Sequence, residues 1–129
     1  MTNDQIPRKI YDLEERTAKF GEEILKFAQK ISPNPVTVPL ISQLVKSGTS
    51  IGANYCEADD AESGQDFKHK IGISKKEARE TKHWLRMIAI TCPDSKEEAR
   101  KLWPEAKELH LIFNSIVKSF KNKKKIIRP

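Results

Sequence analysis

The sequence predicts an all-α protein, an up-down antiparallel bundle of four helices. Four stretches of the 129-residue chain repeat apolar residues with the period of an α-helix. No stretch shows the sustained apolar alternation of a half-buried strand, and no Asn-Gly or Asp-Gly hairpin turn occurs. The breaks between the four stretches are short, so consecutive helices should lie side by side and run in opposite directions. The length suits one domain with a single core.

The first predicted helix covers about residues 11–31 and the second about residues 36–60. Apolar residues of the first recur at helical spacings, and the helix ends at Pro33 and Pro35. A proline disfavours helical backbone in the residue before it and donates no backbone hydrogen bond. Pro39 is compatible with the second helix because it falls in the first turn, where its missing N–H would be unpaired in any case.

The third predicted helix covers about residues 64–91 and the fourth about residues 95–121. Ser63 and Asp66 have the spacing of a side-chain cap at the start of the third helix. Within the fourth, Pro104 predicts a kink, or a short leading turn before the main helix. The end of this helix is expected to fray into a basic tail.

Charge is concentrated in that C-terminal tail, residues 118–129. The tail carries six Lys or Arg and no acid, which leaves 18 basic and 18 acidic residues in the rest of the chain. The net charge of +6 is therefore a property of the tail, and its lysines are candidates for contact with a polyanion. They are Lys118, Lys121, Lys123, Lys124 and Lys125.

The third helix carries two rows of side chains outside its core stripe. Five cations fall within roughly 60° of one another when each residue advances 100°; they are Lys68, Lys75, Arg79, Lys82 and Arg86. Nearly opposite lie Ile73, Trp84 and Met87. These three either widen the apolar face that packs inside the bundle or form a contact surface for another copy of the chain, since Trp and Met are favoured at interface centres. We favour the second interpretation, which predicts a homo-oligomer.

The second helix combines small residues with a polar strip along its edge. Gly48 and Gly52 lie in mid-helix, where glycine is unfavourable, so a neighbouring helix should approach closely there. The strip includes Asn54, whose amide lies near the core stripe and needs a hydrogen-bond partner. It either joins the second helix to the third, or to another subunit, or belongs to a ligand site; we favour the structural role.

The chemistry of an enzyme or metal protein is missing. The sequence has no P-loop, no GxGxxG and no GxSxG motif, and its three histidines lack zinc spacing. Di-iron bundles need Glu-x-x-His pairs on two facing helices, whereas Glu80 with His83, and Asp66 with His69, lie on one helix. We therefore predict no catalytic residue, no metal, no cofactor and no small-molecule substrate.

The composition also argues against a membrane or secreted protein. One third of the residues are charged, and no apolar run approaches the roughly 18 residues needed to span a bilayer. The N-terminal segment lacks the apolar stretch of a signal peptide, and two cysteines are too few for a disulfide framework. We expect a cytoplasmic protein with free thiols.

The second and third helices resemble a known family. The runs that carry the likeness are QLVKSGTSIGANYxEA at residues 43–58, DF at 66–67 and KKExxETxxWL at 75–85. They resemble the four-helix-bundle family of 23S rRNA intervening-sequence proteins, which is similar in fold to the accessory proteins of diversity-generating retroelements. The resemblance implies a bundle that assembles into a ring-like homopentamer with basic surface and no enzymatic activity. The positions that match the family signature are Ser50, Asn54, Glu57, Glu80 and Trp84.

Two functions follow from these observations. The first is a non-enzymatic, oligomeric bundle that binds the backbone of RNA or DNA through basic surface without reading sequence. Few aromatic residues accompany the cations in the sequence, so stacking on unpaired bases is expected to be weak. The alternative is a protein-interaction scaffold or accessory subunit without nucleic-acid contact, in which the lysine-rich tail is a solvated end.

Overall fold

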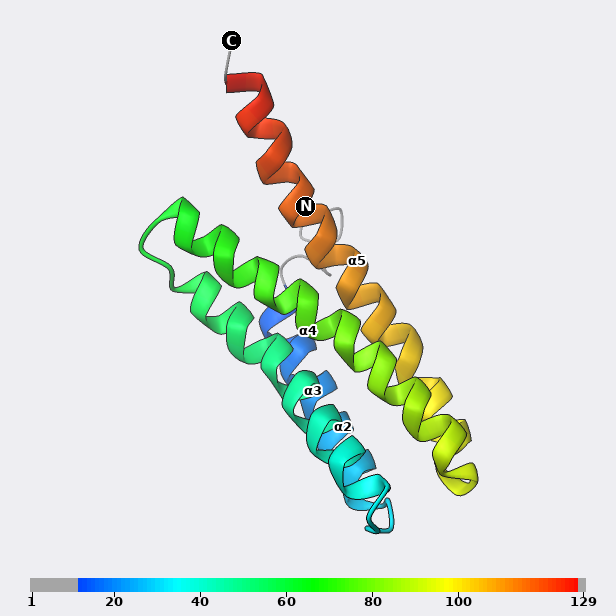
Figure 1. The fold of residues 1–129 in the computed structure, drawn as a ribbon. Coiled ribbons are helices and arrows are strands. Elements are labelled where there is room, and N and C mark those ends of the chain that lie inside the picture. Colours follow the sequence, from blue (N-terminus) through cyan, green and yellow to red (C-terminus); the bar gives the residue numbers. More distant parts are fainter. Residues whose placement is uncertain (1–11, 128–129) are drawn as a thin grey trace, which may run out of the picture.

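Four α-helices and one short 3₁₀ turn make up the protein. The computed structural model describes residues 12–127, with side chains as far as Lys121. In chain order the elements are α2 (Leu13–Gln29), α3 (Thr37–Asp59), α4 (Gly64–Thr91), the turn η2 (Pro93–Ser95) and α5 (Lys96–Ile127). Each helix runs antiparallel to the one before it (Figure 1). The predicted all-α, up-down bundle is therefore confirmed.

The helix boundaries follow local signals in the sequence. The Ser63 hydroxyl accepts a hydrogen bond from the Asp66 backbone N–H at 3.1 Å, as the cap spacing predicted. The start of α3 has a side-chain cap in addition to the predicted one at Ser63. Asn34 Oδ1 accepts from the N–H groups of Val36 and Thr37 at 2.8 and 2.9 Å, and this satisfies two donors at the helix start.

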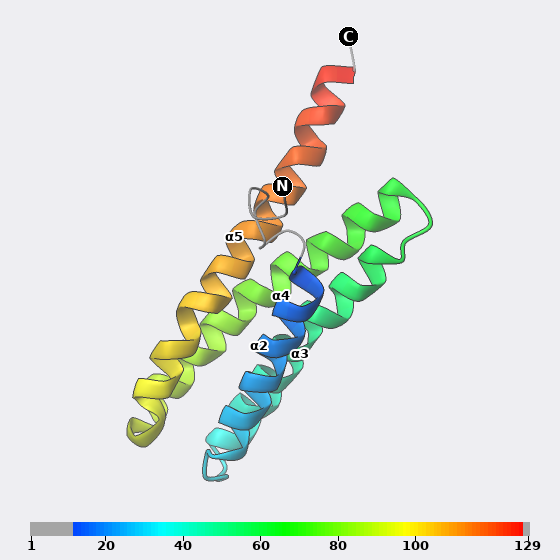
Figure 2. The same cartoon turned by 180° about the vertical axis from the view of Figure 1, so that it is seen from behind.

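The last helix contains Pro104 and is longer than predicted. Pro104 lies inside α5, so the structure shows no separate leading turn there, and the alternative of a kink at this residue stays a prediction. The backbone also stays helical to Ile127, where a frayed tail was expected from residue 122 onward. In both views of the ribbon, the C-terminal turns of α5 project beyond the other three helices (Figures 1 and 2).

Replacing Pro104 by alanine is expected to stabilise the protein by about 1–2 kcal/mol. Alanine restores the helical N–H that proline lacks and removes the ring's steric conflict, although proline's restriction of the unfolded chain offsets part of this gain. Urea denaturation followed by circular dichroism measures the change. Pro93→Ala is the control, because Pro93 opens η2, where an added N–H gains no helical partner and no stabilisation should follow.

A single apolar core runs along the bundle axis. The spacing of the third predicted helix places seven residues in one core-facing stripe, and in α4 six of them are buried while Phe67 at its start is half-buried. The six are Ile71, Ser74, Ala78, Thr81, Leu85 and Ile88. The largest fully buried side chains come from all four helices and include Phe20, Phe27, Ile51, Leu85 and Phe113.

Two buried hydroxyls of α4 fasten it to α3. Thr81 Oγ1 donates to Ser47 Oγ at 3.0 Å, and Ser74 Oγ donates to the Ile51 carbonyl at 3.0 Å. Asn54 does not make this connection within the chain, and a bond of its side chain to another subunit stays a prediction. Its side-chain amide donates to the Ser50 carbonyl at 2.9 Å, one turn earlier in the same helix, because Asn54 lies at the edge of the interface rather than inside it.

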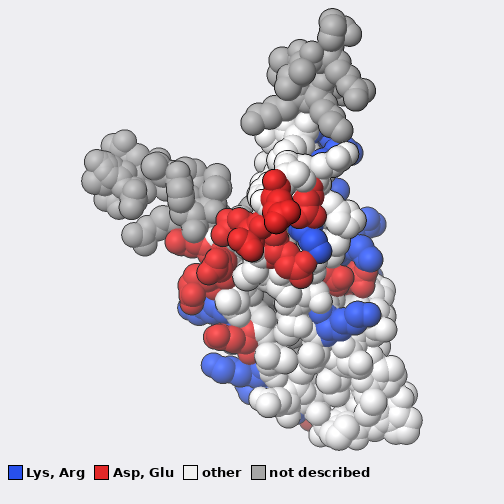
Figure 3. Space-filling view, turned by 90° about the vertical axis from the view of Figure 1, so that its left-hand side faces the viewer, with Lys and Arg blue, Asp and Glu red and all other residues white. Residues whose placement is uncertain are grey.

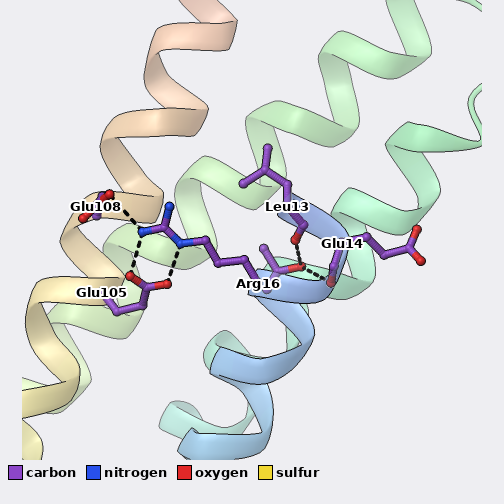
Figure 4. A network of polar contacts seen from close by, with 6 residues as sticks. Leu13, Glu14, Arg16, Glu105 and Glu108 are labelled. Carbon is purple, nitrogen blue, oxygen red and sulfur yellow. Dashed lines mark hydrogen bonds and ion pairs between the residues drawn. The ribbon is translucent and has the colours of Figure 1, made fainter. Parts of the chain in front are cut away.

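An arginine clamp joins α2 to α5, which contact one another less extensively than the other neighbouring helices do. Arg16 donates two hydrogen bonds to the Glu105 carboxylate, at 2.7 and 2.8 Å, and its guanidinium also pairs with Glu108 at 3.0 Å (Figure 4). The bidentate geometry makes this a strong ion pair. It also turns both carboxylates toward α2 and so away from the side of α5 that borders α4.

Candidate nucleic-acid interface

The predicted row of cations on α4 borders the groove between α4 and α5. Lys68, Lys75 and Lys82 are half-buried, whereas Arg79 and Arg86 are exposed. Half-burial of the lysines is compatible with their charge, because the aliphatic stems lie along the protein while the ammonium groups reach water. The row therefore presents five positive charges along one edge of the helix.

Side chains of α5 complete this surface from the other side of the groove. Lys82 Nζ lies 3.4 Å from His110 Nδ1, and the ammonium groups of Lys82 and Lys107 lie 5.8 and 5.6 Å from the centre of the Trp103 ring. Farther along, the rings of Phe67 and Phe120 pack 5.5 Å apart, so the start of α4 lies beside the end of α5. We call this surface the basic seam; its members are Lys68, Lys75, Arg79, Lys82 and Arg86 of α4 with Trp103, Lys107, His110 and Lys121 of α5.

Lys118 and Lys121 are the described cations of the predicted tail, and both are exposed on α5. Lys121 follows Trp103 by five full helical turns and so lies on the same side of the helix. Lys118 lies within about 60° of it. Lys123, Lys124 and Lys125 have side chains outside the described residues.

The electrostatic environment of His110 reflects the convergence of these charges. Burial lowers the pKa of His110 below its ordinary value of 6.5, and the charges of Lys82, Lys75 and Arg79 lower it further. Three cations of α4 thus act on one side chain of α5. The seam is a region of positive potential rather than a set of isolated charges.

Carboxylates are held on other faces. Arg16 clamps Glu105 and Glu108 against α2, and Lys30 Nζ pairs with Glu98 at 3.0 Å. Five more acids and no cation occur between residues 57 and 66, around the turn from α3 to α4. Figure 3 shows acidic side chains gathered on the face that carries this turn. Among residues 12–121, no ion pair involves any of the five α4 cations of the seam.

The lowered pKa of His110 predicts that the protein loses stability as the pH falls through about 6.5. The unfolded chain, with an ordinary histidine pKa, binds a proton at a pH where folded His110 is still neutral, so acid favours unfolding. We expect the imidazole signal of His110 in a nuclear magnetic resonance titration to give a pKa below 6.5. In His110→Gln this part of the pH dependence of urea denaturation should disappear. A His110 pKa above the ordinary value would contradict this prediction.

Comparison with known proteins places the chain in a family. The family described as 23S rRNA-intervening sequence protein matches residues 11–125. The chain belongs to this family. The resemblance inferred from the second and third helices is thereby confirmed, and it extends over most of the sequence. No curated protein matches the chain.

A solved structure agrees with the assignment of the chain to this family. It is the crystal structure of a protein with unknown function from the S23 ribosomal protein family of Bacteroides thetaiotaomicron VPI-5482. The two proteins share 30% sequence identity with a TM-score of 0.74, and the match covers 81% of this chain and 97% of the other. The family and this neighbour carry no indication of an enzymatic activity.

The apolar row of the third predicted helix is half-buried within a single copy of the chain. Ile73, Trp84 and Met87 all have intermediate exposure, and Trp84 packs against the core. The Trp84 indole N–H is buried and has no hydrogen-bond partner among the described residues. Part of the row therefore widens the bundle's own apolar face, and its role as an interface between copies remains a prediction.

The family-signature positions of this intervening sequence protein lie away from the basic seam. Glu57 pairs with Lys70 at 2.6 Å across the α3–α4 turn, and Asn54 bonds within α3 to Ser50. Glu80 is half-buried on α4, where its charge adds to burial in raising the pKa of the nearby Glu77. The structure does not gather these residues into one site.

Within the described part of the chain, the features of a metal or membrane protein are not found. No group of three or more His, Cys, Asp or Glu among those residues is arranged to hold a metal ion. None of the described helices is both long enough and apolar enough to cross a membrane.

Proposed function

We propose that the protein is a non-enzymatic, oligomeric protein that binds the backbone of RNA or DNA through its basic seam. The observation that supports it most is the arrangement of charge across the α4–α5 groove. Cations of both helices meet there, while three of the four acids of α5, Glu98, Glu105 and Glu108, pair with Arg16 or Lys30 on another side. Such a surface can follow a row of phosphates without contacting base edges.

The binding energy would come from the release of counterions. Each phosphate neutralised by a lysine or arginine frees condensed cations from the nucleic acid, so affinity falls steeply as salt rises. In an oligomer, several seams would act on one polyanion, and their affinities would multiply through a high effective concentration. A homopentamer, which the family resemblance implies, would provide five seams.

Salt dependence tests this proposal. A filter-binding titration against duplex and structured RNA, repeated at about 50 and 200 mM salt, should show a loss of affinity of at least about 100-fold, in line with several released counterions per complex. Equal affinity at both concentrations would reject the proposal. Absence of binding even at the lower concentration would favour the scaffold function instead.

Removal of residues 118–129 tests how much the tail contributes, because it takes away six cations, one of which, Lys121, belongs to the seam. We expect the truncated protein to keep about half of the salt slope, because the five cations of α4 and Lys107 stay in place. Complete loss of binding in this variant would assign the contact to the tail alone.

The size of the native particle tests the proposed oligomer. Light scattering at high loading should give a mass of several times 14.8 kDa. A species of single-chain mass at every concentration would contradict both the oligomer and the interface assigned to Ile73, Trp84 and Met87.

A further inference from the structure

An open pocket lies at the end of the basic seam, where α4 turns through η2 into α5. It has a volume of about 510 Å³, within the usual range for sites of small organic groups. Its walls are mainly apolar, and three exposed cations lie among the residues that line it. The residues that matter here are Ile90 and Trp103 on the walls and Arg86, Lys96 and Arg100 as cations.

Shared residues make the pocket continuous with the seam. Arg86 is the last cation of the α4 row and also lines the pocket. Trp103 lines it as well, while its ring stands within 6 Å of the ammonium groups of Lys82 and Lys107. A polyanion lying along the seam therefore reaches the pocket without leaving positive surface.

The lining indicates a ligand that is flat and apolar on its faces and anionic at its edge. Ile90 is 80% exposed, which is unusual for a side chain of its size and leaves apolar surface uncovered at the pocket. No carboxylate occurs among the described residues that line it. An indole beside guanidinium and ammonium groups is the combination that single-strand binding proteins use to stack a base and neutralise its phosphates.

We propose that the pocket holds one unpaired base of a nucleic-acid strand whose phosphates lie on the basic seam. The base stacks against Trp103 and the apolar walls, and the flanking phosphates contact Arg86, Lys96 and Arg100. This inference rests on the proposed function and adds to it a preference for strands with an unpaired nucleotide. It also gives Trp103 a role that the scarcity of aromatic residues in the sequence argued against.

Two strands with equal numbers of phosphates test whether the base contributes to the affinity. An oligothymidine should bind about tenfold more tightly than an abasic strand of the same length, because only the first can stack. In a Trp84→Phe variant, Trp103 is the remaining tryptophan of the two, and its fluorescence should be quenched by the oligothymidine but not by the abasic strand. Thymidine monophosphate should bind at least about 100-fold more weakly than the oligothymidine, since it lacks the phosphates that the seam holds.

A negative charge placed in the pocket tests whether the base binds there. Ile90→Glu should reduce the preference for the oligothymidine over the abasic strand to about one, because the carboxylate repels the nucleotide. The matched control is Leu25→Glu, which adds the same charge at an exposed leucine on α2, in a groove lined by other residues. It should preserve the tenfold preference.

The outcomes separate the pocket from the seam. Equal binding of thymidine and abasic strands, or unchanged Trp103 fluorescence while the strand binds, would contradict the binding of a base in the pocket. Neither result would contradict the binding of phosphates along the seam. Equal affinity for thymidine monophosphate and the oligothymidine would show that the pocket binds a nucleotide without help from the seam, and this would contradict the proposal that one strand occupies both. Dissociation of an oligomer by Ile90→Glu but not by Leu25→Glu would assign the pocket to a second copy of the chain. Absence of binding by any nucleic acid would remove both proposals.

Discussion

Replacing Lys75 and Arg79 together by glutamate is expected to lower the affinity for RNA about 100-fold, because two phosphate contacts are lost and two repulsions appear. Both side chains lie in the middle of the seam, close enough to His110 for their charges to lower its pKa. The loss should be similar for RNAs of different sequence, since backbone contacts carry no sequence information. The slope of log affinity against log salt should become shallower by about two, one unit for each lost contact.

A matched double variant on another helix controls for net charge. Lys19 and Lys26 are exposed on α2, and their replacement by glutamate changes the total charge by the same amount. We expect it to weaken binding by less than about threefold through long-range attraction, which salt screens. Equal losses in both double variants would show that net charge alone drives binding, without a defined surface.

The pKa of His110 in the variant with glutamate at positions 75 and 79 shows whether its fold is intact. With the charges at positions 75 and 79 reversed, the positive field at His110 weakens and the pKa of this histidine should rise toward its ordinary value. A rise measured by nuclear magnetic resonance, together with an unchanged circular dichroism spectrum, would show that the bundle is intact and that the groove has changed sign.

Replacing Gly48 by alanine is expected to destabilise the protein by about 2 kcal/mol, although alanine is the better helix former. A Cβ at this position would lie 2.8 Å from Cγ2, 3.0 Å from Cγ1 and 3.2 Å from Cβ of Ile24. Ile24 is completely buried between α2 and its neighbours, and its branched carbon has little freedom to move. The two helices would have to separate to admit the methyl group.

Gly72→Ala is the matched control for this effect. Gly72 lies in the middle of α4, and no atom outside its own helix would come within 4 Å of an added Cβ. The substitution should stabilise the protein by about 1 kcal/mol through helix propensity alone. Urea denaturation of both variants would then separate two chemically identical changes by about 3 kcal/mol. Stabilisation by both would mean that α2 tolerates displacement from α3.

Most of the fold could be predicted because helical period and core position are properties of local sequence. The stripe from Ile71 to Ile88 is buried as predicted, and the Ser63 cap forms. At Pro104 the sequence offered a leading turn or a kink, and it could not choose between them because a proline disfavours a helix without always ending it; α5 continues through Pro104. The bond of Asn54 within its own helix could not be predicted, because the spacing of one helix does not reveal which polar groups its neighbour offers.

The candidate site could be predicted only on one side. The α4 row follows from the spacing of five cations, but its partners Trp103, Lys107 and His110 depend on the register between α4 and α5. The sequence does indicate that these three residues form one surface, since they are spaced four and three apart and therefore share one side of a helix. What the sequence lacked was the identity of the helix that borders this side of α5, which depends on how the four helices pack around the core.

The contacts of Arg16 with Glu105 and Glu108 also bear on how a partner would arrive. Two carboxylates against one guanidinium leave the α2–α5 groove with surplus negative charge, while the groove on the other flank of α5 is positive. The molecule is therefore electrically polarised across its width. As a polyanion approaches, this charge asymmetry would orient the protein with its positive flank toward the polyanion before the two make contact. Such orientation increases the rate of association.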